Sequence, residues 1–403
     1  MQIARLELRD FRNYESLNLD INEKTNLFFG QNGQGKTNLL EAVYMCSCAR
    51  SHRTARDQDL VRRGSEKYYI KVSFAEKGKY TESVALACDL SGRSRSFWHD
   101  DIPIRRSSDW VGLFHTVMFS PQDLQLICGS PSVRRRFLDM FISQLWPAYF
   151  RDLQLFNRLL SQRNSLLKLF RDLPPGEQRE RRLELNVWDE QYALAAARIM
   201  QRRQTVVNRL SAHAEKKHTS IAGCDETLGI EYRPSVRSLI TDPAEPETEE
   251  IRRLLLARLS ANADDDVLRG WTGVGAHRDD IMIQIDGVDA RLYASQGQQR
   301  TAVLALKLAE IELMREVTRS APVLLLDDVL SELDSVRRRA LMDSIGDIQV
   351  LITCTDRDWF DLNWASLSDS SADIEYFLVR DGKVFPEGVI PEEDEVSEET
   401  FLE

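Results

Sequence analysis

The 403-residue chain has no apolar run near the roughly 18 residues of a membrane-spanning helix. Its opening residues, MQIARLELRDF, alternate as a strand does and do not resemble a signal peptide. The six cysteines form no CxxC pair and no His–Cys cluster at metal-binding spacing. These absences argue against a membrane protein, a disulfide-rich secreted domain and a zinc module. We therefore expect a cytoplasmic protein with reduced thiols and no membrane partner.

Internal repeats are also absent, and no heptad run is long enough for an extended coiled coil. Hydrophobic residues make up 42% of the chain, enough for more than one core, so we expect one elaborate domain or two lobes.

An overall positive charge, typical of nucleic-acid-binding proteins, is missing too, since the net charge is −11. The charge is unevenly distributed, however: residues 1–240 hold 37 Lys and Arg against 28 Asp and Glu, whereas residues 241–403 hold 16 against 36. The segment 391-PEEDEVSEETFLE-403 alone contributes seven acids and no base, and we expect it to be a flexible, solvated tail. Seven arginine clusters in the positive part predict a phosphate-binding surface, although any one of them would pass as an ordinary solvated face. These clusters are 50-RSHRTAR-56, Arg62 and Arg63, Arg93 and Arg95, Arg105 and Arg106, 134-RRR-136, 179-RERR-182, and Arg202 and Arg203.

The secondary-structure pattern changes twice along the chain. Alternation predicts strands at 3–11, 68–74 and 82–90 within a β-rich region that ends near residue 120. Amphipathic helices are expected from about 131 to 218, with a loop tip at 174-PPG-176, and strand-like pattern returns after about 272. We therefore predict an α/β fold with one lobe from residues 1–120 and 272–390, interrupted by a mostly helical lobe from residues 121–271.

The stretch 28-FFGQNGQGKTNLLE-41 has the spacing of a phosphate-binding loop, with Gly30, Gly35, Lys36 and Thr37 at its defining positions. In that pattern backbone amides hold the phosphates, the lysine reaches the outer ones and the hydroxyl binds Mg²⁺. A short apolar strand at 25–29 precedes the loop and an apolar helical pattern follows it, so a helix N-terminus would face the phosphates. The pattern thus predicts an ATP and Mg²⁺ site, against the alternative of a plain strand-to-helix turn.

A second motif, 322-PVLLLDDVLSELD-334, supports the first. Its buried strand ends in Asp327, where P-loop enzymes place an acid beside the magnesium ion. Asp328 points differently and could orient or deprotonate the attacking water. A third motif, 295-SQGQQRTAVLALKLAEIELM-314, is a polar turn that opens onto a long helix, a second potential anion site.

With these motifs the chain resembles the ABC-type ATPases of the SMC and Rad50 group, and within that group the RecF family of bacterial recombination mediators. The resemblance is collinear over nearly the whole chain. It rests on 9-RDFRNY-14, GQNGQGKT, 119-FSPQDLQLICGSPSVRRRFLD-139, 275-GAHRDD-280, SQGQQRTAVLALKLAE and LLLDDVLSELD. It implies an ABC-type P-loop ATPase head with Walker A at 30–37, Walker B at 323–328 and a signature turn at 295–299, and no long coiled coil.

The resemblance also implies residue roles. Nucleotide would be bound by the loop residues Gly30, Gln31, Asn32, Gly33, Gln34, Gly35, Lys36, Thr37 and Asn38, and in trans by the signature residues Ser295, Gly297 and Gln298. Mg²⁺ would be bound by Thr37, Asp327 and Gln122, and catalysis would use Asp328, Lys36 and Gln122. Gln125 is an alternative to Gln122, and 331-SELD-334 would form the D-loop.

The sequence departs from the broader ABC pattern in three ways. The turn reads SQGQQ rather than LSGGQ, which favours DNA repair over transport. Asp328 replaces the usual catalytic glutamate, so we expect slow hydrolysis. The switch histidine is missing, and its place falls to Thr353 or Thr355.

Two arginine-containing segments each allow two interpretations. His277 and Arg278 could lie near the nucleotide or dimer seam, or simply stabilise their loop. Likewise 134-RRR-136 could contact DNA or pair with acids such as Asp139. The DNA-contact candidates are Arg50, Arg53, Arg56, Arg62, Arg63, Arg134 and Arg135.

The function implied is an ATP-dependent homodimer and weak DNA-dependent ATPase, associated with the nucleoid when bound to DNA at single-strand gaps and duplex junctions. The resemblance implies that it works with RecR and RecO to load RecA in repair, replication restart and the SOS response. The alternatives are an ATP-switched DNA clamp with little turnover and, less favoured, a transport-type ATPase.

Overall fold

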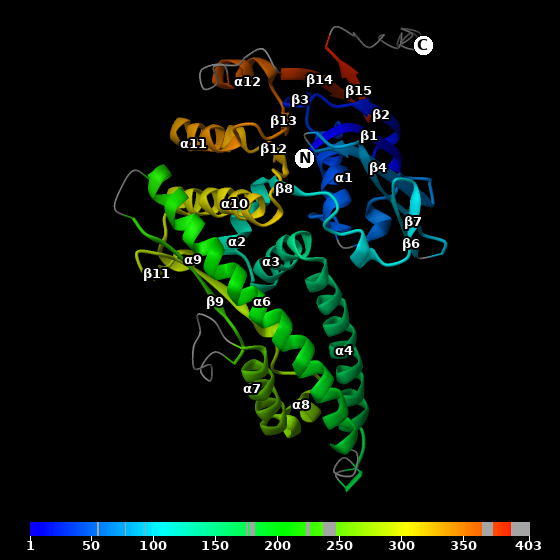
Figure 1. Ribbon diagram of the computed structural model, residues 1–403, viewed down its shortest axis with the longest axis vertical. Coiled ribbons are helices and arrows are strands. Elements are labelled where there is room, and N and C mark those ends of the chain that lie inside the picture. Colours follow the sequence, from blue (N-terminus) through cyan, green and yellow to red (C-terminus); the bar gives the residue numbers. More distant parts are fainter. Residues whose placement is uncertain are drawn as a thin grey trace, which may run out of the picture.

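The computed structural model describes residues 1–54, 56–76, 78–92, 94–174, 176–177, 182–222, 226–236, 247–364 and 374–387. The predicted acidic tail at 391–403 lies outside these residues, as do Arg93 and most of the 179–182 cluster. Figure 1 shows a head that contains the two large sheets, with a long helical region extending away from it. Within the described chain, no helix combines the length and apolarity needed to cross a bilayer.

A six-stranded, mostly parallel sheet forms the centre of the head, in the order β15-β14-β3-β13-β12-β8. β15 is its one antiparallel member. The strands are β3 (Thr25–Phe29), β8 (Thr116–Phe119), β12 (Val323–Asp327), β13 (Val350–Cys354), β14 (Ile374–Arg380) and β15 (Lys383–Pro386). Side chains that alternate along β12 fill two different cores: Val323 and Leu325 face one, and Leu324 and Leu326 the other. This explains why the strand reads as a continuous apolar run, because a sheet buried on both faces has no polar side.

A second, antiparallel sheet covers one face of the head, in the order β2-β1-β4-β5-β6-β7. Its strands are β1 (Gln2–Phe11), β2 (Tyr14–Asp20), β4 (Lys67–Ala75), β5 (Glu82–Asp89), β6 (Ser94–His99) and β7 (Ile102–Ile104). Helix α1 (Lys36–Cys48) shares one hydrophobic core with both sheets, so it is packed from two sides. The strands predicted at 3–11, 68–74 and 82–90 are confirmed within a residue or two.

The other face of the central sheet shares its core with the helices of the insertion and with α10 (Gln296–Thr318). In Figure 1 the long helix α6 (Arg182–Ala222) runs from the region of α10 to the far end of the molecule, beside α4 (Pro147–Arg171). The other helices of this region are α2 (Gln125–Cys128), α3 (Pro131–Leu145), α7 (Thr248–Ala261) and α8 (Ala263–Arg269). The fold class predicted from the sequence is confirmed, and no long coiled coil extends from the described part of the molecule.

A buried arginine joins three of these helices. Arg163 on α4 donates to Asp189 on α6 at 2.6 Å and to Asp266 on α8 at 2.8 Å. Its side chain is fully buried, and Thr272 accepts a further hydrogen bond at 2.9 Å. A buried cation with two carboxylate partners fixes how the helices meet, although such pairs contribute less to net stability than their geometry suggests.

A small third sheet, in the order β11-β10-β9, was not expected as a unit. Its strands are β9 (Leu228–Arg233), β10 (Asp280–Ile285) and β11 (Val288–Asp289), so it joins the segment predicted as helical to the segment that follows. β9 and β10 pair antiparallel from Leu228–Ile285 to Arg233–Asp280 and belong to the same core as the helices. The lobe boundary placed near 272 stays a prediction.

Candidate nucleotide site

The glycine-rich loop follows β3 directly and ends at the first turn of α1. Gly30, Gly33 and Gly35 have φ values of 145°, 84° and 120°, a region that side-chain-bearing residues avoid. A Cβ at Gly30 would lie 2.4 Å from the Val379 carbonyl oxygen, and one at Gly35 would lie 2.6 Å from Asn13 Nδ2. Two glycines are therefore required by close packing, while nothing lies within 4 Å of a Cβ at Gly33.

Lys36 turns back into this loop. Its Nζ donates to the carbonyl oxygens of Gly30 and, at 2.8 Å, Gln31. Burial lowers the pKa of Lys36, and the opposing attraction of Asp328 and Asp327 limits that shift. The ammonium thus lies at the mouth of the loop beside two acids, where it can reach phosphate oxygens.

Walker A and Walker B meet through their side chains. Thr37 Oγ1 donates to Asp327 Oδ1 at 2.8 Å, across 290 positions of sequence. A hydroxyl and a carboxylate at this separation are the hard oxygen ligands that Mg²⁺ prefers, so these residues fit a magnesium ion. Burial raises the pKa of Asp327, and the hydrogen bonds from Thr37 and Thr353 oppose that rise.

Thr353, on β13, holds both acids in place. Its hydroxyl donates to Asp327 Oδ1 at 2.9 Å and accepts from the Asp328 amide at 3.0 Å. Asp328 has a φ of 52°, a left-handed conformation that is uncommon for aspartate. Of the two threonines left open by the sequence, Thr353 is buried against the Walker B strand, whereas Thr355 is exposed.

The turn between β1 and β2 contacts the loop in a way that the sequence reasoning missed. Asn13 Nδ2 donates to the Gln34 carbonyl at 2.8 Å and Asn13 Oδ1 accepts from Asn38 Nδ2 at 2.8 Å. Tyr14 OH donates to the Gly35 carbonyl at 3.1 Å. The segment 9-RDFRNY-14, to which the sequence pattern assigns no role of its own, thus supports the phosphate loop through Asn13 and Tyr14.

The segment after β8 lies next to Walker B in the sheet, because Phe119 pairs with Leu326. Gln122, in the short helix η3 (Pro121–Leu124), is exposed, and so is Gln125. Exposure therefore does not distinguish Gln122 from Gln125 as the candidate γ-phosphate sensor. Asp123 is turned inward, where burial raises its pKa and Lys307 of α10 opposes that rise.

The signature turn forms the N-terminus of α10. Ser295 and Gln298 make a reciprocal capping box, with Ser295 N to Gln298 Oε1 at 2.8 Å. Gln298 Nε2 also donates to Glu226 at 2.9 Å, and the Gly297 carbonyl accepts from Arg337 at 2.8 Å. Among the described residues, the hydrogen bonds of this turn do not reach the phosphate loop of the same chain.

The segment 331–334, the predicted D-loop, is joined to the predicted signature helix. Arg300 Nη1 donates to the Glu332 carbonyl at 3.0 Å, and Asp334 caps α11 (Ser335–Ile345) by accepting from the Arg337 amide at 2.9 Å. Arg337 therefore bonds the signature turn and the start of α11 at once. These two elements are held as one unit.

The candidate DNA-contact arginines separate into different environments. Arg56 and Arg63 are exposed. Arg53 donates to Asn38 at 2.9 Å, beside the phosphate loop, and Arg62 pairs with Glu15 at 2.8 Å. Arg50 and Arg135 line a cavity between the head and the helices.

Arg134 does not match the expectation of a surface cation. It is 6% exposed and forms a bidentate pair with Asp280, at 2.8 and 2.9 Å. The reason is helical geometry: consecutive arginines on α3 point in directions about 100° apart, so they cannot all reach solvent. Arg134 is a structural residue that joins α3 to β10.

The contacts of His277 and Arg278 favour the interpretation that these residues stabilise their own loop. Its Nε2 lies 3.0 Å from the Thr272 carbonyl, which can only accept, and burial lowers its pKa to about 4. The neighbouring Asp279 is fully buried and accepts from the Ser235 amide at 2.7 Å. The Arg278 guanidinium lies 4.2 Å from the Trp271 ring centroid. These contacts stabilise the loop that precedes β10.

Strand, glycine loop, helix and a paired-acid strand, with a capped signature helix, define a P-loop ATPase head of the ABC class. The model of the RecF/RecN/SMC N-terminal domain family matches residues 2–367. The chain belongs to this family and, within it, to RecF, the DNA replication and repair proteins.

Individual relatives support this family assignment. The chain is 40% identical over 360 residues to the DNA replication and repair protein RecF of Ruminiclostridium cellulolyticum, which covers 89% of this chain and 94% of the relative. It is 39% identical over 388 residues to RecF of Lachnospira eligens, covering 96% and 100%. A solved structure of the recombination mediator protein RecF with ATP, in the RecFOR pathway, aligns with a TM-score of 0.85 at 34% identity, over 96% of this chain and 97% of that one. An SMC head bound to a ScpA domain aligns at 0.51 and 15% identity, over 96% of this chain and 97% of that one, which supports the fold alone.

Proposed function

We propose that this chain is an ATP- and Mg²⁺-dependent recombination mediator that dimerises on ATP. One observation carries the proposal: the chain has a phosphate loop and, elsewhere, a signature helix whose N-terminus, within the described part of the chain, bonds Glu226 and Arg337 but not that loop. Helix N-terminal amides favour anions. A signature turn that docks on the γ-phosphate held by a second copy would make ATP the link between two heads.

The chain's own residues would act as follows. Lys36 and the loop amides bind the outer phosphates, while Thr37 and Asp327 hold the magnesium ion. Asp328 orients the attacking water, with Gln122 beside the γ-phosphate. Hydrolysis removes the group that the signature turn recognises, so the dimer opens.

DNA binding completes the proposal. A dimer would present the exposed Arg56 and Arg63 twice, and each phosphate contact adds to affinity and to its salt dependence. We propose that the dimer binds at single-strand gaps and duplex junctions, and acts with RecR and RecO to promote RecA loading. The nearest support is the RecF family membership and the RecFOR pathway in which the similar ATP-bound structure is placed.

An alternative is a nucleotide-switched DNA clamp with little turnover. It is favoured by Asp328, whose side chain is shorter than the usual glutamate and whose carboxylate lies 3.4 Å from Ser331 Oγ of the D-loop. Steady-state hydrolysis with and without gapped DNA separates the two. Strong stimulation supports a DNA-dependent ATPase, and a small response supports the clamp.

The test of dimerisation is the molecular mass in solution with ATP and Mg²⁺, with ADP, and with ATP for two variants. Lys36→Met removes the phosphate-binding ammonium, and Ser295→Arg blocks the signature turn. We expect the unmodified chain to be a dimer with ATP and Mg²⁺ and a monomer with ADP, and we expect both variants to stay monomeric with ATP. An unchanged mass while ATP still binds would reject the trans-signature mechanism.

A further inference from the structure

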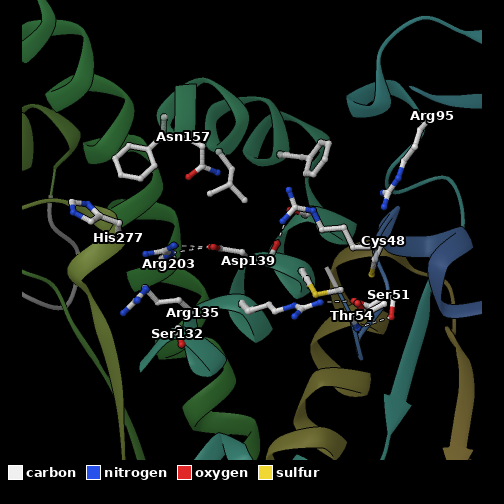
Figure 2. Close-up of a pocket in the computed structure, with 17 residues that line it drawn as sticks. Cys48, Ser51, Thr54, Arg95, Ser132, Arg135, Asp139, Asn157, Arg203 and His277 are labelled. Carbon is white, nitrogen blue, oxygen red and sulfur yellow. Dashed lines mark hydrogen bonds and ion pairs between the residues drawn. The ribbon is translucent and has the colours of Figure 1, made fainter. Parts of the chain in front are cut away.

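A cavity of about 640 Å³ lies between the head and the helical region, and the nucleotide mechanism does not use it. Figure 2 shows Arg135, Arg203 and His277 on one side of it, Ser51, Thr54 and Arg95 on the other, and Asp139 between them. Helix α3 provides Arg135 and Asp139, while α6 provides Arg203. The cavity therefore forms only where the two parts of the chain meet.

Positive charge dominates its lining. Five arginines face it (Arg50, Arg95, Arg135, Arg136 and Arg203) against one carboxylate, that of Asp139. His277 adds no charge at neutral pH, because burial lowers its pKa to about 4.

Carboxylates in and behind the lining neutralise only part of this charge. Arg95 pairs with Asp57 at 3.0 Å, and Arg203 pairs with Asp139 at 2.8 Å and with buried Asp279 at 3.3 Å.

Two of the five arginines are held by neutral groups instead. Arg135 donates to the backbone carbonyl of Asp279 at 2.7 Å, and Arg136 donates to that of Ser51. A carbonyl orients a guanidinium without cancelling its charge. Partial desolvation lowers the pKa of Arg50, the nearby Arg95 and Arg136 lower it further, and Asp139 opposes them.

The rest of the lining is apolar or uncharged. Phe150 and Phe156, both on α4, are 7% and 2% exposed, and Asn157 adds an exposed amide. Arginines can form paired hydrogen bonds to phosphate, and here they lie opposite aromatic and aliphatic side chains. This combination is the lining expected of a nucleotide site.

The cavity is distinct from the phosphate loop. It meets α1 near Cys48 and Arg50, at the opposite end of a 13-residue helix from Lys36. At about 1.5 Å per residue, Cys48 lies roughly 18 Å along the helix from Lys36, while the Ser51 side of the cavity lies nearer to it, because Ser51 bonds Glu41.

Its size limits the ligand. A volume of about 640 Å³ lies within the roughly 300–1,000 Å³ of small-molecule sites, so a single nucleotide or one end of a strand matches it.

We propose that this interlobe cavity binds one nucleotide unit through its phosphate, as a site separate from the ATP site. The nucleotide comes either from a single DNA strand or from a free nucleotide, and both present the same phosphate chemistry. The DNA source rests on the proposed function, but the phosphate binding does not.

The test measures binding of two probes to the full chain without ATP: thymidine 3′,5′-bisphosphate, and a short single-stranded oligothymidylate with a 5′-phosphate. Arg50→Gln and Arg135→Gln remove charge from the cavity, and Asn157→Trp fills it. The matched control is Arg158→Gln, an exposed arginine on the same helix as Asn157 that does not line the cavity. A Lys36→Met version shows whether a probe occupies the phosphate loop instead.

We expect at least one probe to bind, with affinity reduced about tenfold or more by each arginine variant, because each loses hydrogen bonds to a charged group. Asn157→Trp should weaken binding similarly while keeping every arginine, which covers the case of an arginine variant that does not fold. Arg158→Gln and Lys36→Met should bind as the unmodified chain does.

Several results would overturn the proposal: no binding of either probe, equal affinity in the cavity variants and Arg158→Gln, or loss of binding in Lys36→Met. Binding of the oligonucleotide alone identifies a DNA strand as the ligand, and binding of the bisphosphate alone identifies a free nucleotide. Because the assay uses the chain without ATP, it stands or fails independently of ATP-driven dimerisation.

Discussion

The most specific prediction about the nucleotide site concerns Thr353 and the two acids that its hydroxyl contacts. Thr353→Val keeps the size and branching of the side chain but removes the hydroxyl that bonds Asp327 and the Asp328 amide at 2.9 and 3.0 Å. It thereby deletes one hydrogen bond to a carboxylate and leaves one half-buried amide without its partner.

The expected magnitude follows from these two losses. A hydrogen bond to a charged group contributes about 1.5–3 kcal/mol, and an unpaired buried amide costs about 1–3 kcal/mol. The two are not additive, because Asp328 has a left-handed φ of 52° and can relax once its amide is released. We expect the segment around Asp328 to open more easily by about 2–3 kcal/mol, and hence its amides to exchange roughly 30- to 150-fold faster.

The assay is hydrogen–deuterium exchange of peptides that cover residues 325–332, without nucleotide. Thr353→Ser should recover most of the protection, since it keeps the hydroxyl. Thr355→Val is the matched control, because Thr355 is exposed two residues along the chain. If Thr353→Val exchanges at the same rate as Thr355→Val, the hydroxyl does not hold the paired acids and the reasoning is wrong.

Three further predictions concern charge and burial. Asp327 has a raised pKa, so a proton competes with Mg²⁺ for its carboxylate. The affinity for ATP measured with Mg²⁺ should therefore fall as the pH drops through that pKa, whereas the affinity for ATP without metal should not. In Asp327→Asn the two affinities should depend on pH in the same way. His52, His115 and His277 have pKa values lowered from 6.5 to about 4, so between these pH values the unfolded chain binds more protons than the folded chain. The stability that these histidines contribute is present above pH 6.5 and declines toward pH 4, which thermal melting at several pH values should show. Arg163→Met leaves Asp189 and Asp266 buried without a cation and should lower the free energy of unfolding by about 3–5 kcal/mol, with Arg158→Gln within about 0.5 kcal/mol of the unmodified chain in urea titrations.

Much of the site could be predicted from the sequence because its motifs are local. The phosphate loop needs glycines at fixed positions, a lysine and a hydroxyl, and all lie within eight residues. Walker B is a short apolar strand that ends in acids, and the signature turn is a capped helix start. Each is determined by neighbouring residues, so each is visible in the sequence as a pattern.

The remaining features depend on which distant segments meet. Thr353 rather than Thr355 holds the acids because strand pairing places β13 between β3 and β12. Asn13 supports the phosphate loop because the antiparallel sheet that carries it packs on the same core as β3 and α1. β9 escaped notice, since six residues with one glycine give a weak pattern, and only pairing with β10 makes it part of a sheet.

The arginines show the division most clearly. Their number and their concentration in residues 1–240 are properties of the sequence alone. Whether an arginine is buried against Asp280, bonded to Asn38, exposed, or turned into the interlobe cavity is decided by helix direction and by which segments pack together. The partners lie 15 residues apart for Arg53 and Asn38 and 146 apart for Arg134 and Asp280. A charge is a property of a residue, but the partner that neutralises it is a property of the fold.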